Sequence, residues 1–76
     1  MTNKTTKLIL LGRNIKDARK NKGFSQNKLA EMLDISREHL AKIETAKRTL
    51  SMGLLFNICE ILETSEQKLF EFNQQL

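Results

Sequence analysis

Residues 25–44 read SQNKLAEMLDISREHLAKIE, and this stretch decides the fold. Its apolar residues recur at helical spacing on both sides of Asp34-Ile35-Ser36, which predicts two short helices over 26–33 and 37–44. A three-residue connection is too short for two antiparallel helices to lie fully side by side. It favours the tight turn of a helix-turn-helix, in which two short helices cross at a large angle. Asp34 stands where many such turns have Gly, and Asp tolerates positive φ better than most residues.

One helix-start signal recurs along the chain: an apolar residue, then Ser, then three residues, then Leu. A weaker copy has Thr before the Ser, and the four copies centre on Ser25, Ser36, Ser51 and Ser65. Each Ser can cap a helix by accepting a hydrogen bond from a free backbone N–H, and an apolar residue before it can pack on the new helix. The signal therefore predicts helices near residues 26–33, 37–44, 52–62 and 66–73.

A longer helix is predicted ahead of these four, from about Leu8 to Lys22. Its apolar face carries Leu8, Leu11, Ile15 and Ala18. Gly23 is expected to end it, because Gly reaches positive φ without strain. Residues 1–7 are predicted to form a frayed polar tail, which leaves residues 8–76 as the folded domain. We therefore expect one all-α domain, a compact five-helix bundle.

The apolar faces of these five helices supply an expected core. It comprises Leu11, Ile15, Ala18, Leu29, Ala30, Leu33, Ile35, Leu40, Ile43, Leu55, Ile58, Cys59, Leu62, Leu69 and Phe70. Cys59 is interpreted as a small buried core residue rather than a nucleophile, because His39, the one histidine, is on a different helix.

Composition excludes several classes of protein. One Cys, one His and no clustered pair of acids leave no catalytic constellation and no Cys-cluster metal site. We therefore expect neither an enzyme nor a cofactor, and no small-molecule ligand is evident. No apolar run approaches the roughly 20 residues that span a bilayer. The protein is accordingly predicted to be cytoplasmic, with no membrane association.

Charge is distributed unevenly along the chain. The net charge is +4. Residues 1–48 carry 12 Lys and Arg against 5 Asp and Glu, whereas residues 49–76 carry 1 Lys against 4 Glu. A basic front and an acidic back suggest that one side meets a polyanion such as nucleic acid. An ordinary solvated surface is the alternative that charge alone leaves open.

A long match in residue types and spacing identifies a family. Residues 11–26, LGRNIKDARKNKGFSQ, resemble the opening of the Cro/repressor helix-turn-helix family, also called the xenobiotic-response-element family. The match continues through Leu29-Ala30, Ile35-Ser36, Ile43-Glu44 and Lys47-Arg48, then Leu55, Ile58, Leu62, Ser65, Leu69 and Phe70. The resemblance covers about residues 8–72. It implies a lambda-repressor-like five-helix DNA-binding domain, usually a dimer on a palindromic operator.

Four positions depart from the family pattern. Asp34 and Ala46 stand where the family commonly has Gly, and Leu50 where it often has Pro. Gly53 falls in the first turn of the predicted fourth helix. These departures affect the loops and helix starts, and none removes a group expected to face DNA.

The second helix of the motif is expected to enter the major groove of double-stranded DNA. Its candidate DNA-binding residues are Ser36, Arg37, Glu38, His39 and Lys42. Arg37 is expected to read guanine through its forked donors, and Lys42 to reach another guanine or a phosphate. Glu38 has two open interpretations: an acceptor for a cytosine amino group, or an i, i+4 partner of Lys42. His39 is either a DNA contact or simply solvated.

Phosphate contacts are expected on both sides of this helix. Gln26 stands at the start of a helix, where the family resemblance also assigns a phosphate contact. Lys47 and Arg48 follow the recognition helix, and Lys28, Lys4 and Lys7 are weaker candidates. The resemblance further implies an ion pair between Arg19 and Glu44, which would orient the recognition helix.

Apolar residues left over from the core predict a dimerisation surface near the C-terminus. They are Leu54, Phe56, Ile61, Phe72 and Leu76. The alternative is that several of them cover the protein's own core. The favoured function is a small stand-alone transcriptional regulator of the repressor or restriction-modification controller type, acting as a homodimer. An antitoxin-like DNA-binding subunit and a protein-interaction module with the same fold remain alternatives.

Overall fold

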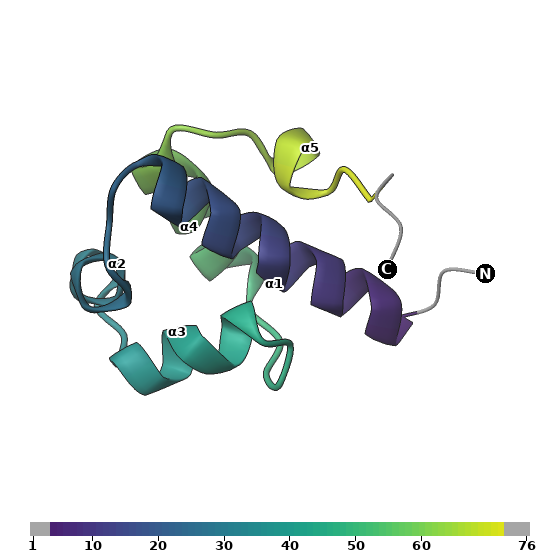
Figure 1. The fold of residues 1–76 in the computed structure, drawn as a ribbon, viewed down its shortest axis with the longest axis horizontal. Coiled ribbons are helices and arrows are strands. Elements are labelled where there is room, and N and C mark those ends of the chain that lie inside the picture. Colours follow the sequence, from purple (N-terminus) through teal and green to yellow (C-terminus); the bar gives the residue numbers. More distant parts are fainter. Residues whose placement is uncertain (1–3, 73–76) are drawn as a thin grey trace.

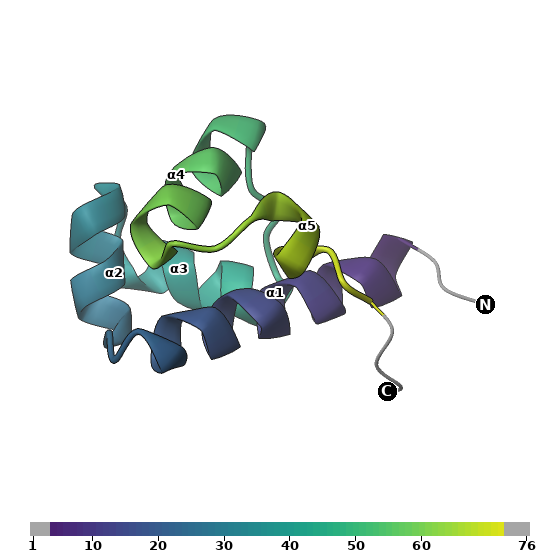
Figure 2. The ribbon, with the colours of Figure 1, turned by 90° about the horizontal axis from the view of Figure 1, so that it is seen from above.

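The computed structural model describes residues 4–72, which form five helices and no strand. In chain order the helices are α1 (Lys4–Asn21), α2 (Gln26–Leu33), α3 (Arg37–Glu44), α4 (Met52–Leu62) and α5 (Glu66–Leu69). Figure 1 shows α1 crossing the molecule, with α3 on one side of it and α5 on the other. Seen from above, α5 lies beside α4 and over α1 (Figure 2). The predicted all-α five-helix bundle is confirmed.

All four serines of the start signal cap a helix. Each side-chain Oγ accepts a hydrogen bond from the backbone N–H three residues later, which belongs to Lys28, His39, Leu54 or Lys68. This geometry satisfies one of the N–H groups that a helix start leaves without an internal partner. The starts of α2 to α5 therefore lie where the sequence predicts them.

Left-handed residues end three of the helices. Gly23 follows α1 with φ of 79°. Asp34 ends α2 with φ of 59° and ψ of 42°, and Glu63 ends α4 with φ of 55°. The backbone N–H of Asp34 reaches back to the carbonyl of Ala30, which closes the turn before α3. The predicted roles of Gly23 and Asp34 are both confirmed.

Two predicted boundaries were wrong. α1 begins at Lys4, so residues 4–7 are helical rather than part of a tail. No Gly or Pro interrupts them, and adding a turn to a formed helix is easier than nucleating one. α5 ends at Leu69 instead of residue 73. The side-chain Nδ2 of Asn14 donates to the carbonyl oxygens of Leu69 at 2.8 Å and Glu71 at 3.2 Å. These bonds tie the end of α5 to α1.

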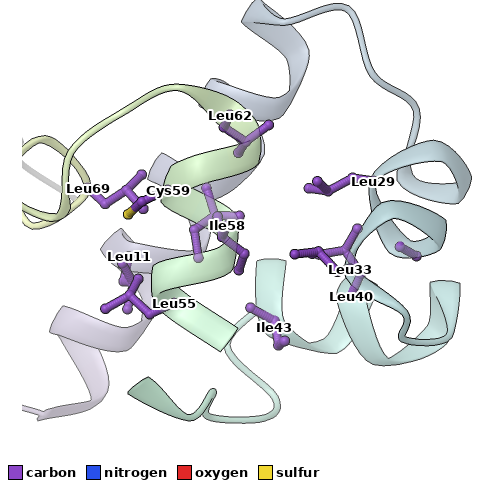
Figure 3. Close-up of a cluster of buried hydrophobic side chains, with 12 residues drawn as sticks. Leu11, Leu29, Leu33, Leu40, Ile43, Leu55, Ile58, Cys59, Leu62 and Leu69 are labelled. Carbon is purple, nitrogen blue, oxygen red and sulfur yellow. The ribbon is translucent and has the colours of Figure 1, made fainter. Parts of the chain in front are cut away.

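Side chains from all five helices build one core (Figure 3). Most of the predicted core residues are buried, and Ala18 and Ile35 pack against the core while half-buried. Phe70 was wrongly assigned to it, because α5 ends before this residue and leaves its side chain 47% exposed. Leu10 was missed, although it is buried.

Gly12 sets the distance between α1 and the end of α3. A Cβ at this position would lie 2.7 Å from the carbonyl oxygens of both Ile43 and Glu44. Because backbone atoms cannot move aside as a side-chain tip can, only Gly allows this approach. The contact places α3 against α1 and leaves the opposite face of α3 to solvent.

Candidate nucleic-acid interface

The outer face of α3 carries most of the predicted DNA-reading residues. Ser36, Arg37, Glu38 and Lys42 are exposed, whereas Leu40, Ile43 and Glu44 are buried. This division follows from the helical repeat, which turns residues three and four apart to the same side. His39 is half-buried, so it lies closer to the body of the protein than the sequence suggests. α3 thus presents a polar, charged edge to solvent.

Glu38 and Lys42 form no ion pair within the described range 4–72. Thr45, which was not among the predicted DNA-binding residues, caps the C-terminal end of α3. Its hydroxyl donates to the carbonyl of Ala41 at 2.8 Å. In this structure both Glu38 and Lys42 keep their charged groups available to a ligand.

The loop after α3 is held by backbone hydrogen bonds. The N–H of Lys47 donates to the carbonyl of Lys42 at 2.7 Å, and that of Ala46 to Ile43 at 3.1 Å. Ala46 has φ of 63°, a conformation that explains the Gly common here in the family. Lys47 and Arg48, both exposed, lie in the turn just beyond the end of α3. Two cations therefore flank the helix on its C-terminal side.

A buried ion pair joins α1 to α3. Arg19 Nε donates to Glu44 Oε2 at 2.7 Å, and Arg19 Nη2 donates to Glu44 Oε1 at 3.2 Å. The third nitrogen, Nη1, donates to the carbonyl of Phe24 at 2.8 Å. This is the pair that the family resemblance implies. It connects three parts of the chain: α1, the start of the loop before α2, and the end of α3.

Gln26, the first residue of α2, joins this pair. Its Nε2 donates to Glu44 Oε1 at 3.0 Å. The sequence suggested a phosphate contact for Gln26 but gave no sign of this bond, because nothing local links residues 18 positions apart. We call Arg19, Glu44 and Gln26 the Glu44 network. None of its buried side-chain polar atoms lacks a partner among the described residues.

The residues predicted for dimerisation divide into two groups. Leu54, Ile61 and Phe72 are half-buried and pack against the core of their own chain. Phe56 is different, with 51% of its surface exposed. Leu76 lies outside the described residues.

Three other large apolar side chains of the described range are exposed: Met32 on α2, Met52 on α4 and Phe70, which the sequence had placed in the core. Met52 is 62% exposed and stands one turn before Phe56 on the same flank of α4. Phe70 lies at the end of α5, with its ring centroid 5.8 Å from that of Phe72. We refer to the three exposed side chains Met52 and Phe56, on α4, and Phe70, at the end of α5, together as the apolar patch.

Two ionisable groups outside the outer face of α3, the Glu63 carboxyl and the Cys59 thiol, have pKa values shifted by their surroundings. Lys22, which follows α1, pairs with Glu63 at the end of α4, and this pairing lowers the pKa of the Glu63 carboxyl. Burial raises the pKa of the Cys59 thiol, and the charge of Glu66 and its hydrogen bond with the thiol add to the rise. Within residues 4–72, no three His, Cys, Asp or Glu residues gather as metal ligands. Nor is any helix of that range long and apolar enough to cross a membrane.

Comparisons with known proteins agree on one type of domain. A helix-turn-helix family model matches residues 15–69. An uncharacterised HTH-type transcriptional regulator of Rickettsia conorii is 36% identical over 61 residues, which cover 80% of this chain and 49% of that protein. The HTH-type transcriptional regulator RamB of Mycobacterium tuberculosis is 39% identical over 51 residues, 67% of this chain and 11% of that protein. The chain thus spans half or less of the length of these relatives.

One solved structure is similar over nearly its whole length. It is the restriction-modification controller protein C.AhdI from Aeromonas hydrophila, with a TM-score of 0.78 and 25% sequence identity. The similarity covers 83% of this chain and 96% of that one.

Proposed function

Because the chain belongs to the helix-turn-helix family, we propose that it is a transcriptional regulator that binds double-stranded DNA as a homodimer. In this proposal α3 enters the major groove and reads base edges, with Arg37 on guanine and Lys42 on a second base or a phosphate. The observation that carries the proposal is the exposed charged edge of α3. The position of α3 against α1 is fixed by the close approach at Gly12 and by the bond between Arg19 and Glu44.

The phosphate contacts in this proposal come from two cations after α3 and from the start of α2. Lys47 and Arg48 are exposed just beyond α3, and Gln26 stands at the start of α2. The first N–H groups of a helix have no partner inside it and attract an anion. Phosphate contacts at both ends of the motif would fix its register on the duplex and leave discrimination to Arg37 and Lys42.

A second copy of the chain is the proposed partner of the apolar patch. α5 packs against α4, and Cys59, one turn after Phe56 on α4, is buried in the core to which Leu69 of α5 also belongs. Met52, Phe56 and Phe70 would then belong to one surface, and exposed apolar surface of this kind is typical of protein contacts. Two-fold pairing through it would set the two α3 helices about 34 Å apart, on successive major grooves.

The controller type is the regulator class that we favour, because the likeness to C.AhdI extends over 96% of that chain. Selection of bound duplexes from a random DNA pool tests the proposal. We expect an enriched palindrome whose half-sites lie one helical turn apart. If no sequence is enriched, the proposal that α3 reads DNA is wrong, and the result favours a protein-interaction module with the same fold.

A further inference from the structure

The carboxylate of Glu44 is fully enclosed by donors. Its side chain is 1% exposed, and it accepts two hydrogen bonds from Arg19 and one from Gln26. An ionised carboxylate offers acceptors only. Whatever faces it must therefore be a donor, which limits how each neighbouring side chain can be oriented.

This limit decides the orientation of the Gln26 amide. Turning the amide over would bring its Oε1 against Glu44 Oε1, so that two acceptors would face each other at a part-buried contact. The Nε2 end must therefore point inward, where it lies 3.0 Å from Glu44. A primary amide nitrogen carries two hydrogens, so one N–H remains after this bond is made. Gln26 is only half-buried, and that N–H can meet a group outside the protein.

The neighbouring backbone favours an anion at this place. Ser25 accepts from the N–H of Lys28, so the earlier N–H groups of α2, at Gln26 and Asn27, have no partner within the helix. The spare amide N–H of Gln26 lies at the same helix start. Arg19 also matters here, because its positive charge offsets that of Glu44 and prevents a bare carboxylate from repelling a nearby phosphate.

We propose that Glu44 is a positioning residue for DNA binding, which holds the amide of Gln26 so that its second N–H is presented to a backbone phosphate. This inference rests on the DNA binding proposed above. It makes the last residue of α3 part of the phosphate contact of α2. The Glu44 carboxylate then fixes the position of the Gln26 amide relative to α3.

A double-mutant cycle tests the proposal. The variants are Gln26→Ala, Glu44→Asp and the pair together, measured for affinity on the selected duplex and for thermal stability. Aspartate keeps the charge that Arg19 needs but is one methylene shorter, so it cannot reach both partners. Glu60→Asp, the same change on the exposed side of α4, is the matched control and should leave affinity unchanged.

We expect Gln26→Ala to weaken binding about tenfold, equally on selected and unrelated duplexes, because a phosphate contact carries no sequence information. Glu44→Asp should cost a similar factor alone and less than about twofold when Ala already stands at position 26. An equal loss in both backgrounds would overturn the proposal and assign Glu44 to helix placement alone. If the wild-type protein binds no duplex, the proposed function itself fails instead.

A second measurement needs no variant. The two Nε2 protons of Gln26 can be followed by NMR in the wild-type protein as DNA is added. We expect the proton that faces away from Glu44 to shift strongly and the inward one to stay in place. Equal movement of both protons, or of neither, would overturn the proposal.

Discussion

Gly12 in α1 lies directly against the backbone carbonyl of Glu44 at the end of α3, so closely that a Cβ would come within 2.7 Å of the oxygen. The side chain of the same Glu44 pairs with Arg19, two turns further along α1. One residue of α3 is thus fixed twice, through its backbone and through its carboxylate. These two contacts determine how the exposed edge of α3 is presented.

Replacement of Gly12 by Ala should destabilise the fold. The added methyl group would collide with backbone rather than with a flexible side chain, so α1 and α3 must separate, at a cost of about 1–3 kcal/mol. Gly53→Ala is the matched control, because nothing lies within 4 Å of a Cβ there. It should be neutral or slightly stabilising. Urea unfolding of both variants measures the difference, and equal stability would mean that α1 and α3 are not in close contact.

Loss of Arg19 should be far more costly than loss of a surface cation. Arg19→Ala leaves the enclosed carboxylate of Glu44 without its ion pair, which should lower the free energy of unfolding by about 3–5 kcal/mol. Lys22→Ala removes the partner of the exposed Glu63 carboxylate and should cost far less, because solvent screens an exposed pair. Thermal unfolding of the two variants compares them. Similar melting temperatures would show that the Arg19 pair does not hold the helices together.

A charge in the apolar patch should separate the proposed dimer. Phe56→Glu places a carboxylate where two copies would meet, and we expect a monomer in sedimentation velocity at concentrations where the wild-type protein is a dimer. Met32→Glu is the control, since Met32 is similarly exposed, at 43%, but lies on α2. A variant at Phe56 that sediments like wild type would place the dimer contact elsewhere.

The Cys59 thiol should make stability fall in alkaline solution. Burial and Glu66 raise its pKa in the folded protein above the ordinary 9.0, so the fold favours the protonated thiol. That contribution is fully present below pH 9 and is lost as the pH rises through the folded pKa. Cys59→Ala should lack this part of the decline. The difference in unfolding free energy between the two proteins, followed from neutral to alkaline pH, should therefore shrink, and a constant difference would contradict the assignment.

Local chemistry explains why much of the fold could be predicted from sequence. The four serine caps depend on a side chain and an N–H three residues away, and Asp34 depends on its own φ. The close approach at Gly12 and the burial of Leu10 depend on where α1 meets the rest of the bundle, so the sequence held no sign of them. Phe70 was misplaced for the same reason, because α5 ends at Leu69, where Asn14 from α1 bonds the carbonyls of Leu69 and Glu71.

The candidate site divides in the same way. Helical periodicity was enough to predict that Arg37, Glu38 and Lys42 lie on the outer face of α3. The bond between Gln26 and Glu44 was not predictable, because it joins two helices whose crossing is known only from the structure. The apolar patch was predicted in part, since periodicity does not distinguish Phe56 from neighbours that cover the core.

Reading of DNA by α3 is tested most directly with Arg37→Ala. Affinity is measured on the selected duplex and on duplexes substituted at each base pair in turn. We expect the binding free energy on the selected duplex to weaken by about 1–3 kcal/mol, with a relaxed preference at one base pair. The control variant Arg13→Ala, on α1, should bind as the wild-type protein does. An equal loss on every duplex would show that Arg37 contacts only the backbone, and would contradict base reading by this helix.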